Sequence, residues 1–193
     1  MLAEGSSFRS EPEVIQASDS MTFSTENAQL LLNRTPLVLD ALLGDLPEGL
    51  DRKNEGPGTW SPFDIMGHLI HGEHTDWIPR ARNILHQTNE GRFEVFDREA
   101  QFSISYGESM SELLSAFAAK RKVNLEELVS WKLSPSDVEK TGIHPEFGRV
   151  TLKEHLSMWM AHDLVHLNQL TRVLAVQFKP AIGPFAQYVN LFG

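Results

Sequence analysis

His162 and His166 are the two residues whose spacing points most directly to chemistry. Residues four apart on an α-helix project from the same face, so both imidazoles can reach one point beside the helix. Two imidazoles at this spacing can bind a single metal ion. The alternative is a pair of histidines at the edge of the core with hydrogen-bonded rings. A metal site therefore requires a third ligand from elsewhere in the chain.

Three histidines in the segment 61–86 are candidates for that third ligand: His68, His71 and His74. They cannot all face one point, because a helix turns by about 100° per residue. The apolar periodicity around Leu69 places His68 beside the inward face, His71 near the edge of that face and His74 toward solvent. We therefore choose His68, and expect His71 to be a surface residue or an outer neighbour of the site.

We expect His68, His162 and His166 to hold one divalent metal ion. Neutral imidazoles suit zinc, nickel, copper or iron(II), and the residues alone do not rank these metals. Three protein ligands leave at least one position for water or substrate, which is typical of a catalytic rather than a structural site. Gly72, one turn beyond His68, leaves space for the metal or a substrate.

Polar neighbours of these histidines have separate expected roles. Gln169, about one turn beyond His166, could orient a bound molecule and is our candidate for a cofactor-binding residue. Asp163 follows the first histidine of the pair directly, so it should point elsewhere and serve another helix. Glu73 is a candidate base but should face away from the metal. No catalytic residue can be assigned from the sequence.

The remaining histidines favour ordinary structural roles. His86 and His155 are expected to be surface or partly buried residues. His144 precedes Pro145 in an expected loop, and a structural role suits it better than a role as a ligand.

Four long amphipathic segments must position these side chains, and they cover residues 24–43, 61–86, 109–131 and 151–176. Each repeats apolar residues at intervals of three and four, and we find no convincing strand pattern. The sequence therefore predicts an all-α four-helix bundle. The connection over 89–106 is long and rich in aromatic residues, which favours a crossover between helices two and three and suggests that it covers something.

Local signals mark several helix ends. Ser61 can cap the second helix, and Thr151 with Glu154 forms a capping box for the fourth. Pro36 should bend or break the first helix, and Pro79 should bend the second, because proline cannot donate the backbone hydrogen bond of a helix interior.

The ends of the chain differ from its middle. Residues 1–20 lack apolar periodicity and should form a loose N-terminal arm, which leaves 21–193 as a single domain. The tail from Lys179 onward carries apolar residues that should pack back on the body: Phe185, Tyr188, Val189, Leu191 and Phe192.

The composition excludes several classes of function. The 193 residues are 41% hydrophobic and 22% charged, close to the averages for globular proteins. The net charge of −9 argues against nucleic-acid binding and against docking on an anionic membrane. The absence of cysteine excludes disulfides, iron–sulfur clusters and cysteine nucleophiles. No apolar run approaches the ~18 residues of a membrane span, and together these features favour a cytoplasmic protein.

The segment from Thr141 to Gln169, which ends in His162-Asp163-Leu164-Val165-His166-Leu167-Asn168-Gln169, carries a family resemblance. Together with Trp60-Ser61-Pro62 and Gly67-His68-Leu69, it resembles the DinB/YfiT-like metalloenzymes, and the resemblance extends over most of the chain from about residue 22. It implies a four-helix bundle with a three-histidine site for nickel or zinc, at His68, His162 and His166.

The resemblance also implies a class of reaction. Family members with assigned activity transfer low-molecular-weight thiols or catalyse thiol-dependent isomerisation, and the family's link with DNA damage implies no DNA binding. The leading hypothesis is thus a metal-dependent enzyme that transfers a low-molecular-weight thiol to a small electrophile. A metal-dependent hydrolase and a non-catalytic bundle that binds a metal or a small molecule are the alternatives. A homodimer remains open.

Overall fold

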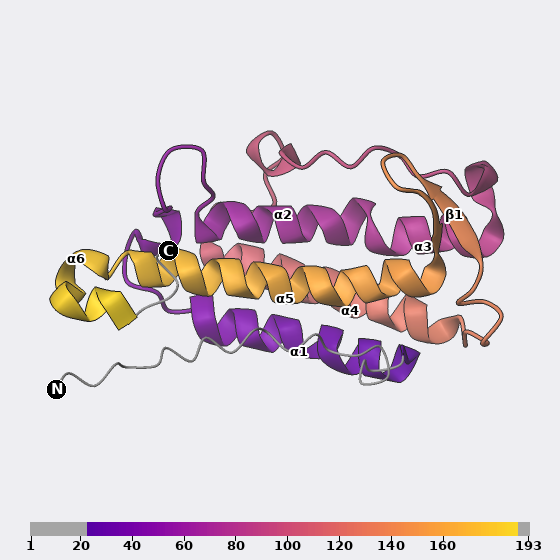
Figure 1. Ribbon diagram of the computed structural model, residues 1–193, viewed down its shortest axis with the longest axis horizontal. Coiled ribbons are helices and arrows are strands. Elements are labelled where there is room, and N and C mark those ends of the chain that lie inside the picture. The colour runs from indigo at the N-terminus through magenta and orange to yellow at the C-terminus, as the bar shows by residue number, and fades with distance from the viewer. Residues whose placement is uncertain (1–22, 189–193) are drawn as a thin grey trace, which may run out of the picture.

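The computed structural model describes residues 23–188 as a bundle of long helices with a short hairpin at one end (Figure 1). The predicted arm at 1–20 lies outside the described residues, as do Val189, Leu191 and Phe192 of the predicted tail. The helices are α1 (Thr25–Leu43), α2 (Pro62–Thr75), α3 (Trp77–His86), α4 (Met110–Ser130), α5 (Leu152–Val176) and α6 (Lys179–Ile182). The strands are β1 (Thr141–His144) and β2 (Gly148–Thr151).

The bundle has the crossover topology that the sequence predicts. Among the four long helices of the bundle, α1 and α2 each pack against α4 and α5, so neighbours along the chain lie at opposite corners of the bundle. After α3 the chain runs back along the length of the bundle before it enters α4 (Figure 1). Helices α2 and α4 therefore run in the same direction, whereas α1 and α5 run in the other.

Two apolar clusters fill the interior of the bundle. One lies toward the start of α2 and includes Leu39, Ile65 and Phe117. The other lies toward α3 and the hairpin and includes Trp77 and Trp159. Each fully buried side chain of this size stabilises the fold by about 1.5–3 kcal/mol, so these clusters are the main source of stability.

Capping residues fix the starts of the long helices. The Ser61 hydroxyl accepts from the backbone N–H of Asp64, and Thr151 makes the same contact with Glu154. In return, each acidic side chain accepts from the backbone N–H of the cap residue. The predicted caps are therefore confirmed. The histidine-bearing helices α2 and α5 thus begin at defined residues, and this fixes the direction in which each histidine projects from its helix axis.

Pro36 does not break the first helix, contrary to one expectation. Helix α1 continues through it from Thr25 to Leu43. Proline has no N–H for the carbonyl four residues earlier, which is that of Leu32. The Arg121 guanidinium donates to this carbonyl instead, at 2.9 Å. A hydrogen bond from another helix thus replaces the one that the proline removes.

The second predicted helix is two helices. Helix α2 ends at Thr75 and α3 begins at Trp77, with Asp76 between them. Pro79 cannot donate to the Thr75 carbonyl, so the helix is interrupted one turn before the proline rather than bent at it. A single continuous helix to His86 was therefore the wrong prediction.

The region predicted as a loop before the fourth helix contains an antiparallel hairpin. Strand β1 pairs with β2, with Gly142 opposite Val150 and His144 opposite Gly148. A side chain at Gly142 would approach the Phe93 ring to 2.7 Å, so glycine lets the hairpin pack closely on the crossover connection. Strands of four residues are too short for an alternation that a sequence can reveal.

The described part of the tail does not pack back on the body, contrary to prediction. It contains α6 and a 3₁₀ segment over Gly183–Tyr188, and neither buries a residue. Phe185 is 69% exposed and Tyr188 is 77% exposed.

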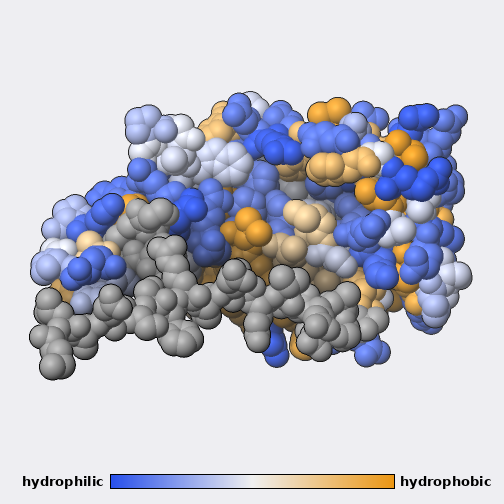
Figure 2. Space-filling view, viewed as in Figure 1, coloured by the Kyte–Doolittle hydropathy of each residue, from blue (hydrophilic) through white to orange (hydrophobic). Residues whose placement is uncertain are grey.

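The surface seen in the orientation of Figure 1 is largely polar, and apolar residues appear on it in smaller groups (Figure 2). This matches a chain with a net charge of −9. Among residues 23–188, no helix combines the length and the apolar character that a membrane span requires.

Candidate metal centre

The three predicted histidines converge on one point between α2 and α5. The Nε2 atom of His162 lies 3.2 Å from Nε2 of His68 and 3.1 Å from Nε2 of His166. The three possible ligand atoms all lie within 4.8 Å of one another. His68 and His166 are buried and His162 is half-buried. Within residues 23–188 this is the cluster of metal-binding groups with suitable spacing.

The arrangement of these nitrogens fits a divalent ion. Metal–nitrogen bonds of ~2.0–2.1 Å at tetrahedral angles separate two ligand nitrogens by about 3.3 Å, close to the two shortest separations here. The buried Nδ1 atoms of His68 and His162 have no hydrogen-bond partner among the described residues. The Nε2 atoms are the ones that converge, and a neutral imidazole that carries its proton on Nδ1 directs the Nε2 lone pair at this point, as a metal ligand must.

Burial keeps these rings neutral, which is the form that binds metal. It lowers the pKa of His68 to about 4, and the neighbouring His166 adds to this effect. It lowers the pKa of His162 to about 2, with further contributions from the other two histidines. The pKa of His166 is also lowered, chiefly by burial.

Gln169 contacts a histidine of the cluster rather than the open side of the site. Its Oε1 atom lies 2.8 Å from Nδ1 of His166. If this carbonyl oxygen accepts, Nδ1 carries the ring proton and Nε2 keeps its lone pair directed at the cluster. Such a bond fixes the orientation of a ligand ring. The predicted contact of Gln169 with a bound molecule stays a prediction.

A large cavity opens beside the three histidines. Its volume is about 810 Å³, within the range of small-molecule sites. Its wall is mostly apolar and includes aromatic rings from α3, the crossover connection and the hairpin. The aromatic residues on the wall are Trp60, Trp77, Phe93, Phe96 and Phe147.

The crossover connection covers part of the site, as predicted. The Phe96 ring lies edge-on to His68, with centroids 5.6 Å apart, and also contacts His71. His71 is buried, and its Nδ1 atom lies 2.8 Å from the Tyr106 hydroxyl, which makes it an outer neighbour rather than a surface residue. His74 is exposed, as expected, and stacks on the Tyr106 ring.

Among the other polar residues that line the same cavity, three are buried: Asp76, Arg80 and His155. His155 is fully packed, with only 7% exposed, so its prediction as a surface or partly buried residue was wrong. It lies on the apolar stripe of α5, where the sequence could have placed it inside. His144 ends β1 and its Nδ1 accepts from two backbone N–H groups of the hairpin turn, a structural role.

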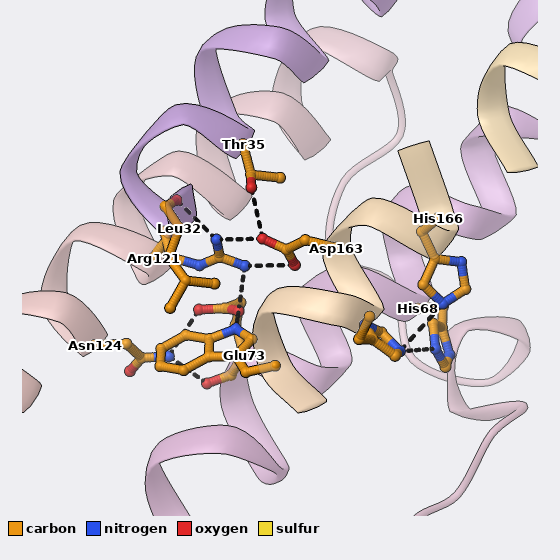
Figure 3. Close-up of polar contacts among 10 residues, drawn as sticks. Leu32, Thr35, His68, Glu73, Arg121, Asn124, Asp163 and His166 are labelled. Atoms are coloured by element: carbon orange, nitrogen blue, oxygen red, sulfur yellow. Dashed lines mark hydrogen bonds and ion pairs between the residues drawn. The ribbon is translucent and has the colours of Figure 1, made fainter. Parts of the chain in front are cut away.

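A second buried polar cluster lies on the other side of α5 (Figure 3). Arg121 is 1% exposed and donates to both oxygens of Asp163, at 2.7 and 3.0 Å, and to Glu73 at 2.9 Å. Asp163 thus serves another helix and Glu73 faces away from His68, as predicted. Arg121 was not predicted to be buried, although it falls one turn after Phe117 on the buried face of α4.

Further donors saturate the two carboxylates of this cluster. Glu73 accepts from the Asn124 amide at 2.9 Å and from the Trp159 indole at 3.0 Å. Asp163 accepts from the Thr35 hydroxyl at 2.6 Å. The cluster therefore joins all four corners of the bundle, directly behind the histidines.

Comparison with known proteins identifies the superfamily of this chain. The model of the DinB superfamily matches residues 31–170. The chain belongs to the DinB superfamily. Among functionally curated proteins, none matches the sequence. The match spans α1 to α5 and includes all three histidines of the cluster.

Two solved structures share this DinB fold. YfiT from Bacillus subtilis, described as a probable metal-dependent hydrolase with an unusual four-helix bundle topology, aligns with a TM-score of 0.69 at 16% identity. The alignment covers 83% of this chain and 91% of YfiT. The four-helix bundle protein TT2238 aligns with a TM-score of 0.52 at 22% identity, over 77% of this chain and 98% of TT2238. At these identities the likeness establishes the fold alone.

Proposed function

We propose that the protein is a metal-dependent enzyme that acts on a small molecule in the cavity beside His68, His162 and His166. One observation carries the proposal: three neutral imidazole nitrogens converge at the wall of a cavity of about 810 Å³. A structural site would enclose its ion with four protein ligands, whereas three ligands beside a cavity leave a position for a reactant.

The residues present suit this role. His68, His162 and His166 would hold the ion, and Gln169 fixes the ring of His166 through Nδ1. When bound, the metal would act as a Lewis acid and lower the pKa of a thiol or water that it holds. The aromatic wall offers apolar contact to a substrate.

Transfer of an external thiol to an electrophile is the favoured reaction. The chain contains no cysteine, so the sulfur nucleophile must come from a second small molecule. A cavity of this size can accommodate a thiol together with an apolar electrophile such as an epoxide, haloarene or quinone. Zinc and nickel are the favoured metals, with iron and copper as alternatives.

Hydrolysis is the second candidate, and the description of YfiT as a probable metal-dependent hydrolase favours it. It would need water in place of the thiol at the same histidines. A bundle that binds a metal or a small molecule without turnover is the remaining alternative.

Elemental analysis of untagged protein tests the metal site first. We expect about one divalent ion per chain. His162→Ala and His166→Ala should each lower the metal affinity sharply, because two ligands hold an ion far less tightly than three. His86→Ala is the matched control, since this histidine is exposed and distant from the cluster. Equal effects of all three substitutions would contradict the site.

Cobalt substitution then tests the reaction. Addition of the correct small thiol should produce a thiolate-to-cobalt absorption band, and the same thiol should be consumed with an electrophile. Both responses should vanish in His68→Ala. Fully metallated protein that gives neither response with a broad panel of cellular thiols, but cleaves ester or amide substrates, would favour hydrolysis.

A further inference from the structure

The cavity has a second polar region, away from the three histidines. Asp76, Arg80 and His155 line it, and each is at least nine-tenths buried, with exposures of 8%, 8% and 7%. They come from the junction of α2 with α3 and from the first third of α5. We call these three residues the distal polar group. The mechanism proposed above uses none of them.

The distance between the two polar regions of the cavity follows from the spacing of their histidines along α5. His155 precedes His162 by seven residues on α5, which corresponds to about 10 Å along the helix axis. The Trp77 ring lies between them, with its centroid 5.0 Å from that of His162 and 5.7 Å from that of His155. One molecule lying along this aromatic wall could therefore reach both regions.

The contacts within the distal polar group leave acceptor atoms of Asp76 and His155 unused, and Oδ1 of Asp76 forms an ion pair but no hydrogen bond. Arg80 pairs with Oδ1 of Asp76 at 2.9 Å and donates to the Glu94 carbonyl at 2.9 Å. Nε2 of His155 lies 2.8 Å from the Trp77 carbonyl, which can only accept, so Nε2 carries a proton.

The ring of His155 is neutral, because burial lowers its pKa to about 4. Its Nδ1 is therefore an unprotonated acceptor. Neither this atom nor Oδ2 of Asp76 has a hydrogen-bond partner among residues 23–188.

Asp76 is not engaged in capping a helix. It occupies the N-cap position of α3 but makes no capping bond with its side chain. Pro79, at the third position of that helix, has no N–H to offer. Burial raises the pKa of Asp76 to about 6 despite the ion pair with Arg80. The carboxyl group of Asp76 is therefore buried at the cavity wall, which is energetically unfavourable, and it does not stabilise the start of α3.

We propose that Asp76 and His155 form a binding subsite for an O–H or N–H donor group of the substrate. The inference rests on the proposed function in one respect: the reacting end of the same molecule would lie at the three histidines. The substrate would then be an elongated small molecule whose donor group lies about 10 Å from the bond that reacts. A neutral donor such as a hydroxyl suits the subsite best, because the charges of Asp76 and Arg80 cancel.

Two thiols of equal length provide the probe, one ending in a hydroxyl and one in a methyl group: 6-mercaptohexan-1-ol and heptane-1-thiol. In metal-free protein, long-range ¹H–¹⁵N spectra report on Nδ1 of His155. At saturation, the alcohol should move this resonance upfield as Nδ1 accepts a hydrogen bond, whereas the alkanethiol should not. A third probe that ends in an ammonium group, 6-aminohexane-1-thiol, distinguishes a charged donor from a neutral one.

Affinities from the cobalt–thiolate band give the second measurement. The ratio of the alcohol affinity to the alkanethiol affinity should fall about tenfold in His155→Gln, because one buried hydrogen bond is lost. The glutamine can still donate to the Trp77 carbonyl, so the fold should survive. Asp76→Asn should lower the same ratio, and the exposed Glu139→Gln is the control that leaves it unchanged.

The outcomes separate the two proposals. An Nδ1 resonance that ignores the alcohol, or an affinity ratio unchanged in both variants, would overturn the subsite. Failure of the metal-dependent function would appear separately, as the absence of any cobalt–thiolate band in the wild-type protein while the Nδ1 resonance still responds to the alcohol.

Discussion

Two buried polar clusters lie on opposite sides of α5, and they differ in how completely the protein satisfies them (Figure 3). In the Arg121 cluster, both terminal nitrogens of the guanidinium and both carboxylates have several partners, and only Nε of Arg121 lacks one. In the histidine cluster, two Nδ1 atoms are unpartnered and three Nε2 atoms face one another. Neighbouring residues of one helix, Asp163 and His162, belong to different clusters.

This difference indicates that the Arg121 cluster stabilises the fold and that the histidine cluster is suited to bind a ligand. Buried charges are tolerated only when they are paired, so the Arg121 cluster has the features of a structural element. It also carries two carboxylates for one guanidinium, which leaves one formal negative charge behind the histidines. The cluster acts on the two histidines of α5 in opposite directions: Asp163 raises the pKa of His166 against the larger effect of burial, whereas Arg121 adds to the lowering of the pKa of His162 by burial.

The largest expected effect is a loss of stability when the Arg121 cluster is disrupted. Arg121→Met should lower the free energy of unfolding of the metal-free protein by about 3–5 kcal/mol, because two buried carboxylates lose their cation. Urea denaturation measures the loss. Arg82→Met is the matched control, since the Arg82 side chain is 49% exposed in its pair with Glu127, and loss of this pair should cost no more than about 1 kcal/mol. Similar losses in the two variants would remove the structural role assigned to Arg121.

His155, on the wall of the cavity, should contribute to a loss of the free energy of unfolding in acid. The folded-state pKa of His155 is about 4, below the unfolded value of 6.5. Its contribution is therefore complete above pH 6.5 and is lost as the pH falls toward 4, because only the unfolded chain takes up a proton there. The loss should amount to roughly 2–3 kcal/mol.

The variant His155→Gln isolates this contribution. The other shifted groups remain in both proteins, including Asp76, whose raised pKa acts in the opposite direction. The free energy of unfolding, measured from pH 7 to 4 without metal, should vary less steeply in the variant. Identical slopes would show that His155 is not held neutral by the fold.

The smallest effect concerns the support of a single ligand. Gln169→Leu should weaken metal binding by about 10–100-fold, because the His166 ring loses the hydrogen bond that orients it. Competition with a chromophoric chelator measures the affinity. Asn168→Leu, at the exposed neighbouring position, should leave it unchanged. An unaltered affinity in Gln169→Leu would mean that the ring is oriented by packing alone.

The features that the sequence predicted correctly depend on short-range rules. The caps at Ser61 and Thr151 follow from hydroxyl residues at helix starts, and the pairing of His162 with His166 follows from helical periodicity. The convergence of His68 with this pair could be predicted from the direction of the apolar face alone. Each of these depends on a few adjacent residues.

The features that were missed depend on contacts between distant segments. A buried arginine contradicts the usual pattern, and Arg121 is tolerated only because three other helices supply its partners. The burial of His155 depends on the Trp77 carbonyl, 78 residues away. The hairpin packs against Phe93, and this contact cannot be predicted from the sequence of two four-residue strands.

The crossover topology also constrains the order in which the site can form. His68 and His162 are separated by 94 residues, with α3, the crossover connection, α4 and the hairpin between them. Closing a loop of this length costs entropy that must be recovered by long-range packing. During folding, an ion would find at most the local pair on α5 until that helix docks against α2. Tight metal uptake should therefore be a late event, and it can serve as a kinetic signal that the bundle has closed.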